Sequence, residues 1–260
     1  MLILLSPAKQ IDFEPARPEL KTSRPALLAR TAELSKTTSK LSRAKLRQLM
    51  DISDDLAALN VERFKAFDPE STQGKAAALA FAGEVYRGLD APNLSKDDLE
   101  WAQDHVRILS GLYGALRPLD AIQPYRLEMG TRLKTRKGAN LYDFWGDDIA
   151  AELTRTLDGH THPVVVNLAS NEYAKAARLA SLKTRVITVD FKEEKSGQLR
   201  ALMVYAKKAR GMMARWIIEN RIEDPEQLGR FNVDGYKLDK AGSKPDRLLF
   251  TRPQPPLKKG

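Results

Sequence analysis

The sequence predicts an α+β fold, a mixed α/β protein in which helices surround a mixed β-sheet within a single compact domain. Two continuous apolar runs, Met1–Leu5 and Val164–Leu168, have the length and composition of buried strands. Between Ala209 and Ile217, apolar residues recur at the i, i+3, i+4, i+7, i+8 spacing of an amphipathic helix. Helical patterns fill residues 24–104, between the first strand and the later ones. We therefore expect an N-terminal helical insertion that packs on the sheet.

Two helix-start signals divide the N-terminal half. Ser42 and Ser53 each precede an apolar helical pattern, as N-cap residues do. They predict two helices over Lys45–Arg63 joined by a very short turn, which is a helix–hairpin–helix arrangement. Such a pair binds a phosphate through backbone amides at the start of the second helix. A core helical pair is the alternative, because Asp54 and Asp55 in that first turn would repel a phosphate.

The same patterns predict the remaining elements. Helices are expected over Ala76–Arg87, after the capping-box-like Ser95, and along the apolar stripe from Trp145 to Leu157. Gly111–Gly138 has no clear periodicity, and a loop of this length in a compact domain is usually functional. Strands are expected at Val106–Leu109, Arg185–Phe191 and Leu202–Tyr205, with a hairpin that runs from the turn at Asp234-Gly235 to Leu248–Phe250.

The composition is that of a globular protein and excludes several kinds of site. Of the 260 residues, 42% are hydrophobic, so we expect a cored domain over residues 1–252 and a frayed Pro- and Lys-rich tail at residues 253–260. The absence of cysteine rules out disulfides, thiolate metal sites and a cysteine nucleophile. No apolar run approaches the roughly 20 residues of a membrane span, and Met1–Leu5 is too short for a signal peptide. A cytoplasmic protein without a membrane partner is expected.

The net charge of +9 is concentrated in two segments. Between Arg107 and Lys137 there are seven Lys or Arg residues against two acidic ones. Between Lys195 and Ile218 there are six basic residues and no acidic one. These segments carry more positive charge than the whole chain, so the rest is slightly acidic. Clustering of this kind favours a polyanionic partner and predicts one basic cleft, although a generally basic surface is the simpler alternative.

Polar side chains follow two of the predicted strands at the points where the strands end. They are Ser6, Lys9 and Asp12 after the first strand, and Asn167, Ser170, Asn171, Glu172 and Lys175 after the Val164–Leu168 strand. Open α/β sheets bind ligands at the carboxyl ends of their strands, so these positions predict a binding site. Helix capping and turn formation would also place polar residues there.

The predicted helix after Tyr205 has a second face, on which Lys207 lies with Gly211 and Ala214. Small residues beside a cation allow a ligand or another backbone to approach closely. Helix packing alone explains the glycine and the alanine equally well.

Nucleotide, metal and cofactor signatures are absent from the sequence. It contains neither a Walker A loop nor a dinucleotide fingerprint, and the Gly111–Gly114 segment is more typical of a tight turn than of a phosphate cradle. The three histidines, His105, His160 and His162, have no carboxylate cluster near them in the sequence. We expect neither a metal site nor a cofactor.

Six motifs, spread in order over nearly the whole chain, resemble those of the peroxide-stress YaaA family. They are Leu5-Ser6-Pro7-Ala8-Lys9 with Asp12, Leu109-Ser110-Gly111-Leu112-Tyr113-Gly114, Leu116-Arg117-Pro118-Leu119-Asp120, Pro124-Tyr125-Arg126-Leu127-Glu128-Met129, Asn167-Leu168-Ala169-Ser170 followed by Glu172-Tyr173, and Lys208-Ala209-Arg210-Gly211. The resemblance implies protection from hydrogen peroxide, through lowered free intracellular iron and less oxidative DNA damage. It also implies an unusual fold with a positively charged cleft and a helix–hairpin–helix, here best matched by Leu46–Asn60.

DNA binding is therefore our first functional hypothesis, with duplex or distorted DNA as the partner and no protein partner indicated. Sequence specificity should be low, because no recognition-helix pattern is present. The residues expected to contact DNA are Lys9, Ser53, Arg117, Arg126, Lys134, Asn167, Ser170, Lys175, Lys207, Lys208 and Arg210.

The alternative is an enzyme, lyase- or glycosidase-like, that acts on a nucleotide, a base or damaged DNA in the same cleft. Its candidate catalytic residues are Lys9, Tyr125 and Glu128, and a desolvated Lys9 would act as a base or as a Schiff-base nucleophile. Direct iron binding is the third and least supported hypothesis, because cysteine is absent and the His and carboxylate spacing is poor.

Overall fold

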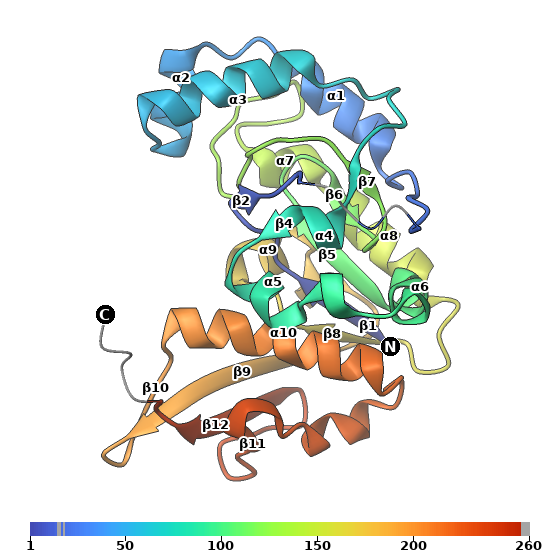
Figure 1. Cartoon of the computed structure of the whole chain (residues 1–260), viewed down its shortest axis with the longest axis vertical. Helices are drawn as coiled ribbons and strands as arrows, with labels where there is room; N and C mark the ends of the chain where they lie inside the picture. The colour runs from blue at the N-terminus through green and yellow to red at the C-terminus, as the bar shows by residue number, and fades with distance from the viewer. Residues whose placement is uncertain (15–16, 18, 256–260) are drawn as a thin grey trace.

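An eight-stranded mixed sheet forms the centre of the computed structural model, which describes residues 1–14, 17 and 19–255 (Figure 1). Its strands are β1 (Leu2–Leu5), β5 (Val106–Ser110), β6 (Gly114–Leu116), β8 (Val164–Asn167), β9 (Arg185–Lys195), β10 (Gln198–Arg200), β11 (Lys237–Leu238) and β12 (Arg247–Pro253). Two small antiparallel pairs lie outside it, β2 (Gln10–Ile11) with β4 (Phe81–Ala82) and β3 (Lys75–Ala76) with β7 (Ala121–Ile122).

The main sheet is parallel at its centre and antiparallel at its edges. The strand order is β11-β12-β9-β8-β1-β5-β6, with β10 paired to β9. Strands β12, β9, β8, β1 and β5 run parallel, whereas β6, β10 and β11 each pair antiparallel. The mixed sheet expected from the sequence is confirmed, as is the hairpin of β11 and β12.

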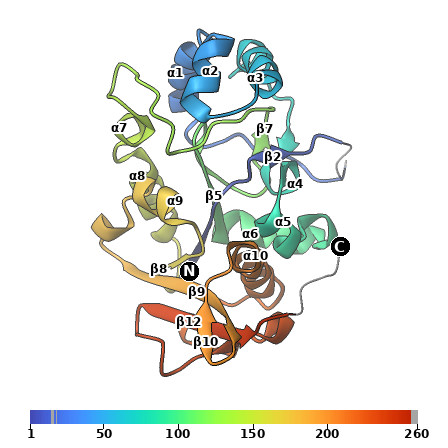
Figure 2. The ribbon, with the colours of Figure 1, turned by 90° about the vertical axis from the view of Figure 1, so that its left-hand side faces the viewer.

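Helices surround this sheet, and three of them gather at one end of the molecule. The α-helices are α1 (Leu28–Thr38), α2 (Arg43–Met50), α3 (Asp54–Ala66), α4 (Ala77–Ala80), α5 (Glu84–Leu89), α6 (Lys96–His105), α7 (Leu141–Trp145), α8 (Asp148–Leu157), α9 (Asn171–Ala176) and α10 (Met203–Glu219). Short 3-10 helices cover Ala91–Asn93, Leu179–Ser181, Pro225–Arg230 and Val233–Gly235. Figures 1 and 2 show α1, α2 and α3 grouped together at the end opposite β11 and β12.

The predicted helix starts at three serines are confirmed. The side chain of Ser42 accepts a hydrogen bond from the backbone N–H of Lys45 at 3.3 Å, and that of Ser53 accepts from Leu56 at 3.4 Å. Ser95 forms a complete capping box with Asp98. These bonds satisfy amide groups that a helix leaves unpaired at its first turn, which explains why the helices begin there.

Three predicted elements were wrong in detail. The single helix expected over Ala76–Arg87 is broken into α4, β4 and α5, because Gly83 adopts φ +154°, a conformation open to glycine. The strand expected at Leu202–Tyr205 is instead the start of α10, since a short apolar run does not distinguish the two states. The helix expected from Trp145 to Leu157 is divided between α7 and α8 at Gly146, where φ is +49°.

Other parts of the chain agree with the predictions only in part. The segment Gly111–Gly138 contains the short strands β6 and β7 within an otherwise irregular path. Residues 256–260, part of the expected tail, lie outside the described residues. Among the described helices, none combines the length and the apolar character that crossing a membrane requires.

The C-terminal strand β12 is held by a buried ionic network. Glu193 in β9 is fully buried, accepts a short hydrogen bond from the hydroxyl of Tyr236, and has its Oε1 3.6 Å from Nε of Arg252. Arg252 also donates to the backbone oxygen of Asp234 at 3.1 Å, and its guanidinium lies 4.4 Å from the centre of the Tyr236 ring. A buried carboxylate depends on such a partner, because an isolated charge is costly to desolvate.

Replacement of Arg252 by methionine is expected to lower the free energy of unfolding by about 3–5 kcal/mol, because it leaves Glu193 buried without its cation. Urea unfolding followed by circular dichroism measures this change. The control is Arg247→Met on the same strand, whose ion pair with Asp190 is exposed on the arginine side and should contribute less than about 1 kcal/mol. An equal loss of unfolding free energy in the two variants would show that the buried network contributes no more than an exposed ion pair.

Candidate functional site

A cleft of about 500 Å³ opens where β1 and β8 end. The two strands are parallel neighbours, with Leu4 paired to Asn167, so the segments that follow them leave the sheet side by side. This is the edge at which open α/β sheets bind ligands. The cleft is lined by residues from five segments: 6–10, 82–85, 125–128, 170–173 and 203–210.

Two serines join the segments that follow β1 and β8. The backbone N–H of Ser170 donates to Oγ of Ser6 at 2.9 Å, and the Ser6 hydroxyl lies 3.4 Å from that of Ser170. The hydroxyl of Tyr86 donates to the backbone oxygen of Ser6 at 3.0 Å. Residues 164 positions apart in the chain are thus held in one place, as the sequence predicted for the ends of these strands.

Glu128 holds two of the predicted cations at one wall of the cleft. Its Oε2 lies 2.8 Å from Nζ of Lys9, and its Oε1 lies 3.2 Å from Nη2 of Arg126. The Lys9 side chain is 63% exposed, whereas that of Arg126 is 17% exposed. Two cations therefore share one carboxylate, and this group keeps a net positive charge.

The side chain of Tyr125 is packed inside the fold. It is buried, and its hydroxyl lies 2.6 Å from Oγ of Ser110 at the end of β5. Its ring packs edge-on against Tyr113, with centroids 5.4 Å apart. Burial raises the pKa of Tyr125 far above its usual range. A phenol in this state stays neutral and does not supply a base at neutral pH.

Arg210 and Lys207 line the cleft from α10, one helical turn apart. Lys207 is exposed, whereas Arg210 is partly buried and its Nε has no hydrogen-bond partner among the described residues. Burial lowers the pKa of Arg210, and Asp190 acts in the opposite direction. The Asp190 carboxylate is itself engaged by Nε of Arg247 at 2.6 Å.

The position of α10 depends on a close crossing with α5. A Cβ atom at Gly211 would overlap the backbone oxygen of Val85, and one at Gly88 would overlap that of Lys208. The glycine predicted to lie beside Lys207 therefore serves helix packing, the second of the two explanations considered for it.

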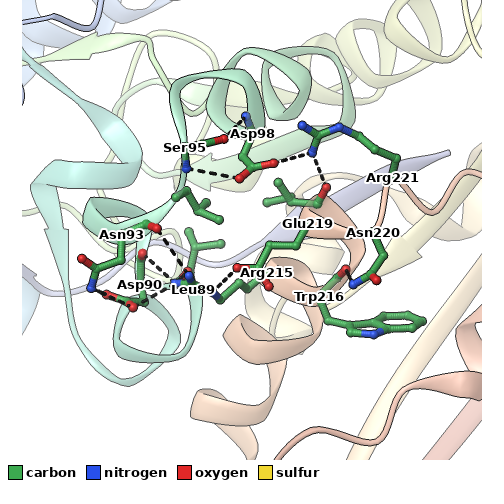
Figure 3. A network of polar contacts seen from close by, with 12 residues as sticks. Leu89, Asp90, Asn93, Ser95, Asp98, Arg215, Trp216, Glu219, Asn220 and Arg221 are labelled. Atoms are coloured by element: carbon green, nitrogen blue, oxygen red, sulfur yellow. Dashed lines mark hydrogen bonds and ion pairs between the residues drawn. The ribbon is translucent and has the colours of Figure 1, made fainter.

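Ion pairs hold the C-terminal half of α10 (Figure 3). Nη1 of Arg215 lies 2.8 Å from the Asp90 carboxylate and donates to the Asp90 backbone oxygen at 3.0 Å. Just beyond the helix, Nη1 of Arg221 lies 2.7 Å from Oδ1 of Asp98. These contacts tie the C-terminal end of α10 to the chain on either side of residues 91–97.

Comparison with known proteins identifies the family. The model of the peroxide stress protein YaaA family matches residues 1–242. The chain belongs to the YaaA family. It is similar to UPF0246 proteins, with 60% identity over 255 residues to that of Maricaulis maris (98% of this chain and 97% of the relative). Identity is 57% over 255 residues to that of Caulobacter vibrioides, covering 98% of this chain and all of the relative.

In this YaaA-family protein, two of the predicted DNA contacts are engaged within the fold. Arg117 pairs with the buried Asp120 at 3.0 Å and donates to the backbone oxygen of Arg24 at 2.9 Å. Asn167 is buried, and its Oδ1 accepts the backbone N–H of Ala169 at 3.1 Å. Both side chains have clear structural roles.

Four further predicted contacts do not line the cleft. The ammonium of Lys175 lies 4.7 Å from the centre of the Tyr142 ring. Ser53 caps α3, while Lys134 and Lys208 are exposed. Of the predicted set, the cleft brings together Lys9, Arg126, Ser170, Lys207 and Arg210, along with the catalytic candidates Tyr125 and Glu128.

An ion-pair cluster links the first turn of α3 to α2. Asp54, in the first turn of α3, forms a short ion pair with Arg43 and lies 3.6 Å from Arg47. The turn between the helices passes through Asp51 at φ +49°. A helix pair with a short turn is therefore present, and its binding of a phosphate stays a prediction.

The histidines pack against one another and against an aromatic residue. His105 stacks on Trp101 with a centroid distance of 3.7 Å, and its ring centre is 4.9 Å from that of His160. Burial lowers the pKa of His160 to about 4, so this ring is neutral at physiological pH. Over residues 1–14, 17 and 19–255, no three His, Asp or Glu side chains are grouped as metal ligands would be.

Several lining residues were missed by the sequence interpretation. Gly83, Glu84 and Val85 reach the cleft because the chain turns at β4, and no local pattern signalled that turn. Glu172 was noted as a polar residue after a strand and as part of a family motif, but it was not among the predicted site residues. Its Oε1 accepts the backbone N–H of Gly130 at 2.7 Å, which fixes the segment that carries Glu128.

Substitution of Gly211 by alanine is expected to lower the free energy of unfolding by about 1–3 kcal/mol or more, because the added Cβ overlaps the backbone of α5. Denaturant unfolding measures the loss. Gly159→Ala is the matched control, since a Cβ there would lie no closer than 3.9 Å to the backbone oxygen of Thr156. A Gly211 variant as stable as this control would refute the close crossing.

Proposed function

We propose that the protein binds duplex or distorted DNA through the cations of its cleft and so limits oxidative DNA damage during peroxide stress. One observation carries the proposal. Lys9, Arg126, Lys207 and Arg210, from three separate parts of the chain, line a single cleft at the carboxyl edge of the sheet. Lys and Arg contacts to phosphates supply most of the sequence-independent affinity of proteins for DNA.

The exposed cations are arranged for a large partner. Lys9 and Lys207 are exposed at the cleft, and Lys208 is exposed next to Lys207 on α10. Other members of the basic segments contribute to the fold instead. Arg107, for example, is 5% exposed and donates to the backbone oxygen of Gln103 at 2.7 Å. The contact surface is therefore smaller than the sequence charge suggests, and it is centred on the cleft.

The geometry favours binding over covalent catalysis. A lysine that forms a Schiff base is usually desolvated or lies beside another cation, in an environment that favours the neutral amine. The Lys9 side chain is instead 63% exposed, and its Nζ lies 2.8 Å from the Glu128 carboxylate. The buried phenol of Tyr125 is also a poor proton acceptor. These groups suit the recognition of an anion.

Binding to a fluorescein-labelled duplex should weaken steeply with salt. Each neutralised phosphate contributes a slope of about −0.9 in log K against log salt concentration. Lys207→Gln is expected to reduce that slope by about one contact and to weaken all duplex sequences alike. Fluorescence anisotropy between 50 and 200 mM KCl, roughly the range where phosphate contacts dominate, gives both quantities.

The control for this titration is Lys240→Gln, an exposed lysine in the turn between β11 and β12. It should bind as the unmodified protein does. Affinity that does not change with salt would overturn the proposal. Borohydride trapping of a DNA adduct that Lys9→Ala abolishes would overturn the binding-only role and favour the enzyme.

A further inference from the structure

The cleft has the size of a small-molecule site. Its volume of about 500 Å³ lies within the range of about 300–1,000 Å³ that is usual for pockets holding one small ligand. A duplex lies across such an opening and does not enter it. The exposed Lys9 and Lys207 can meet phosphates at the rim, whereas the groups deeper in the cleft require a smaller occupant.

Arg210 is the clearest sign that an anion enters. The Nε atom of this side chain is buried without a hydrogen-bond partner among the described residues, and the carboxylate of Asp190 is engaged by Arg247 at 2.6 Å. Burying an N–H group without a hydrogen-bond partner costs free energy. The Nε atom of Arg126, on the same cleft, is also buried and unpartnered in the described part of the chain, while its Nη2 pairs with Glu128 at 3.2 Å. An anionic ligand in the cleft would stabilise both guanidinium groups electrostatically.

The walls suit a flat, mostly apolar group. Pro7, Ala8, Val85 and Leu127 line the cleft together with the buried ring of Tyr173. Stacking between apolar and aromatic side chains is how proteins hold a base that has left the helix stack. The cleft thus combines apolar walls for a base with cationic side chains, Lys207 and Arg210, for its phosphate.

Ser170 supplies a hydrogen-bonding group at this wall. It occupies the N-cap position of α9, yet its side chain makes no capping hydrogen bond. Its hydroxyl oxygen lies 3.4 Å from the donating hydroxyl of Ser6, which leaves the proton of Ser170 available to a ligand. A hydroxyl in this state can donate to the oxygen or nitrogen at the edge of a base.

We infer that the cleft receives a single nucleotide turned out of distorted DNA, with its phosphate between Arg210 and Lys207 and its base against Ala8 and Leu127. The inference rests on the proposed DNA binding and names the part of the DNA that enters. Extruding a base costs a few kcal/mol and least where the base is already unpaired. The protein should therefore prefer DNA with a bulged or mismatched nucleotide to a perfect duplex.

A duplex with 2-aminopurine as a single-nucleotide bulge tests this directly. Loss of stacking raises 2-aminopurine fluorescence, so saturating protein should increase the signal severalfold. Ala8→Phe fills the cleft without removing a cation. It should abolish the fluorescence increase and the preference for the bulge, while its affinity for a perfect duplex changes less than about twofold. Ala241→Phe, at an exposed position in the turn between β11 and β12, should behave as the unmodified protein does.

Arg210→Gln provides a second test that does not depend on how Ala8→Phe folds. It should reduce the fluorescence increase and the affinity for bulged DNA more than the affinity for a perfect duplex. Circular dichroism confirms that each variant is folded before it is titrated.

The outcomes separate the two proposals. Salt-dependent duplex binding without a fluorescence change would overturn the extruded nucleotide and leave DNA binding intact. Binding of free dAMP at the cleft, seen by calorimetry and lost in Ala8→Phe, together with no binding of any DNA, would overturn both and assign the cleft to a free nucleotide. A fluorescence increase that persists in Ala8→Phe would place the extruded base elsewhere and refute the inference.

Discussion

The parallel pairing of β1 with β8 and β5 is the constraint on which the cleft depends. Leu4 pairs with Asn167 on one side and with Arg107 on the other, so three strands end at one edge. The backbone N–H of Leu168 continues the pairing by donating to Leu4 at 3.0 Å. Beyond this point the chains diverge, and the Ser6–Ser170 contact closes the gap. Every residue of β1 and β8 is buried, so packing against both faces of the sheet holds these strands in place and secures the site.

Charge in this protein has two uses that the sequence does not distinguish. The two basic segments predict a polyanion, yet Arg117 and Arg215 are bound to the carboxylates of Asp120 and Asp90. Lys9 lies outside both segments and still reaches the cleft. Which cations face a ligand depends on where each acidic partner lies after folding. Clustering along the chain therefore predicts an anionic partner, and tertiary contacts determine which of the cations pair with acidic groups inside the fold.

The parts of the fold that were predictable are those encoded locally. Val164–Leu168 is apolar throughout because both faces of β8 are buried, and Ser53 begins a helix by binding an amide three residues ahead. The start of α10 was misassigned because Met203 and Val204 are each 59% exposed, so their apolar character does not reflect burial. The cleft was anticipated at the ends of two strands. The contribution of residues 82–85 to the cleft was not anticipated, because β4 reaches the cleft only by pairing with the distant β2.

Helix α10 contributes both to the stability of the fold and to the cleft. Its two halves differ in the contacts that hold them. Its C-terminal half is fixed by the crossing at Gly211 and by the Arg215–Asp90 pair. Its N-terminal half begins with exposed apolar residues and carries Arg210, whose buried Nε has no hydrogen-bond partner among the described residues. A buried N–H without a hydrogen-bond partner lowers the stability of the free protein, and an anion that binds only the folded state would offset that loss. The close crossing with α5 therefore lets the fold tolerate, next to the cleft, a partly buried guanidinium group from which anion affinity would arise.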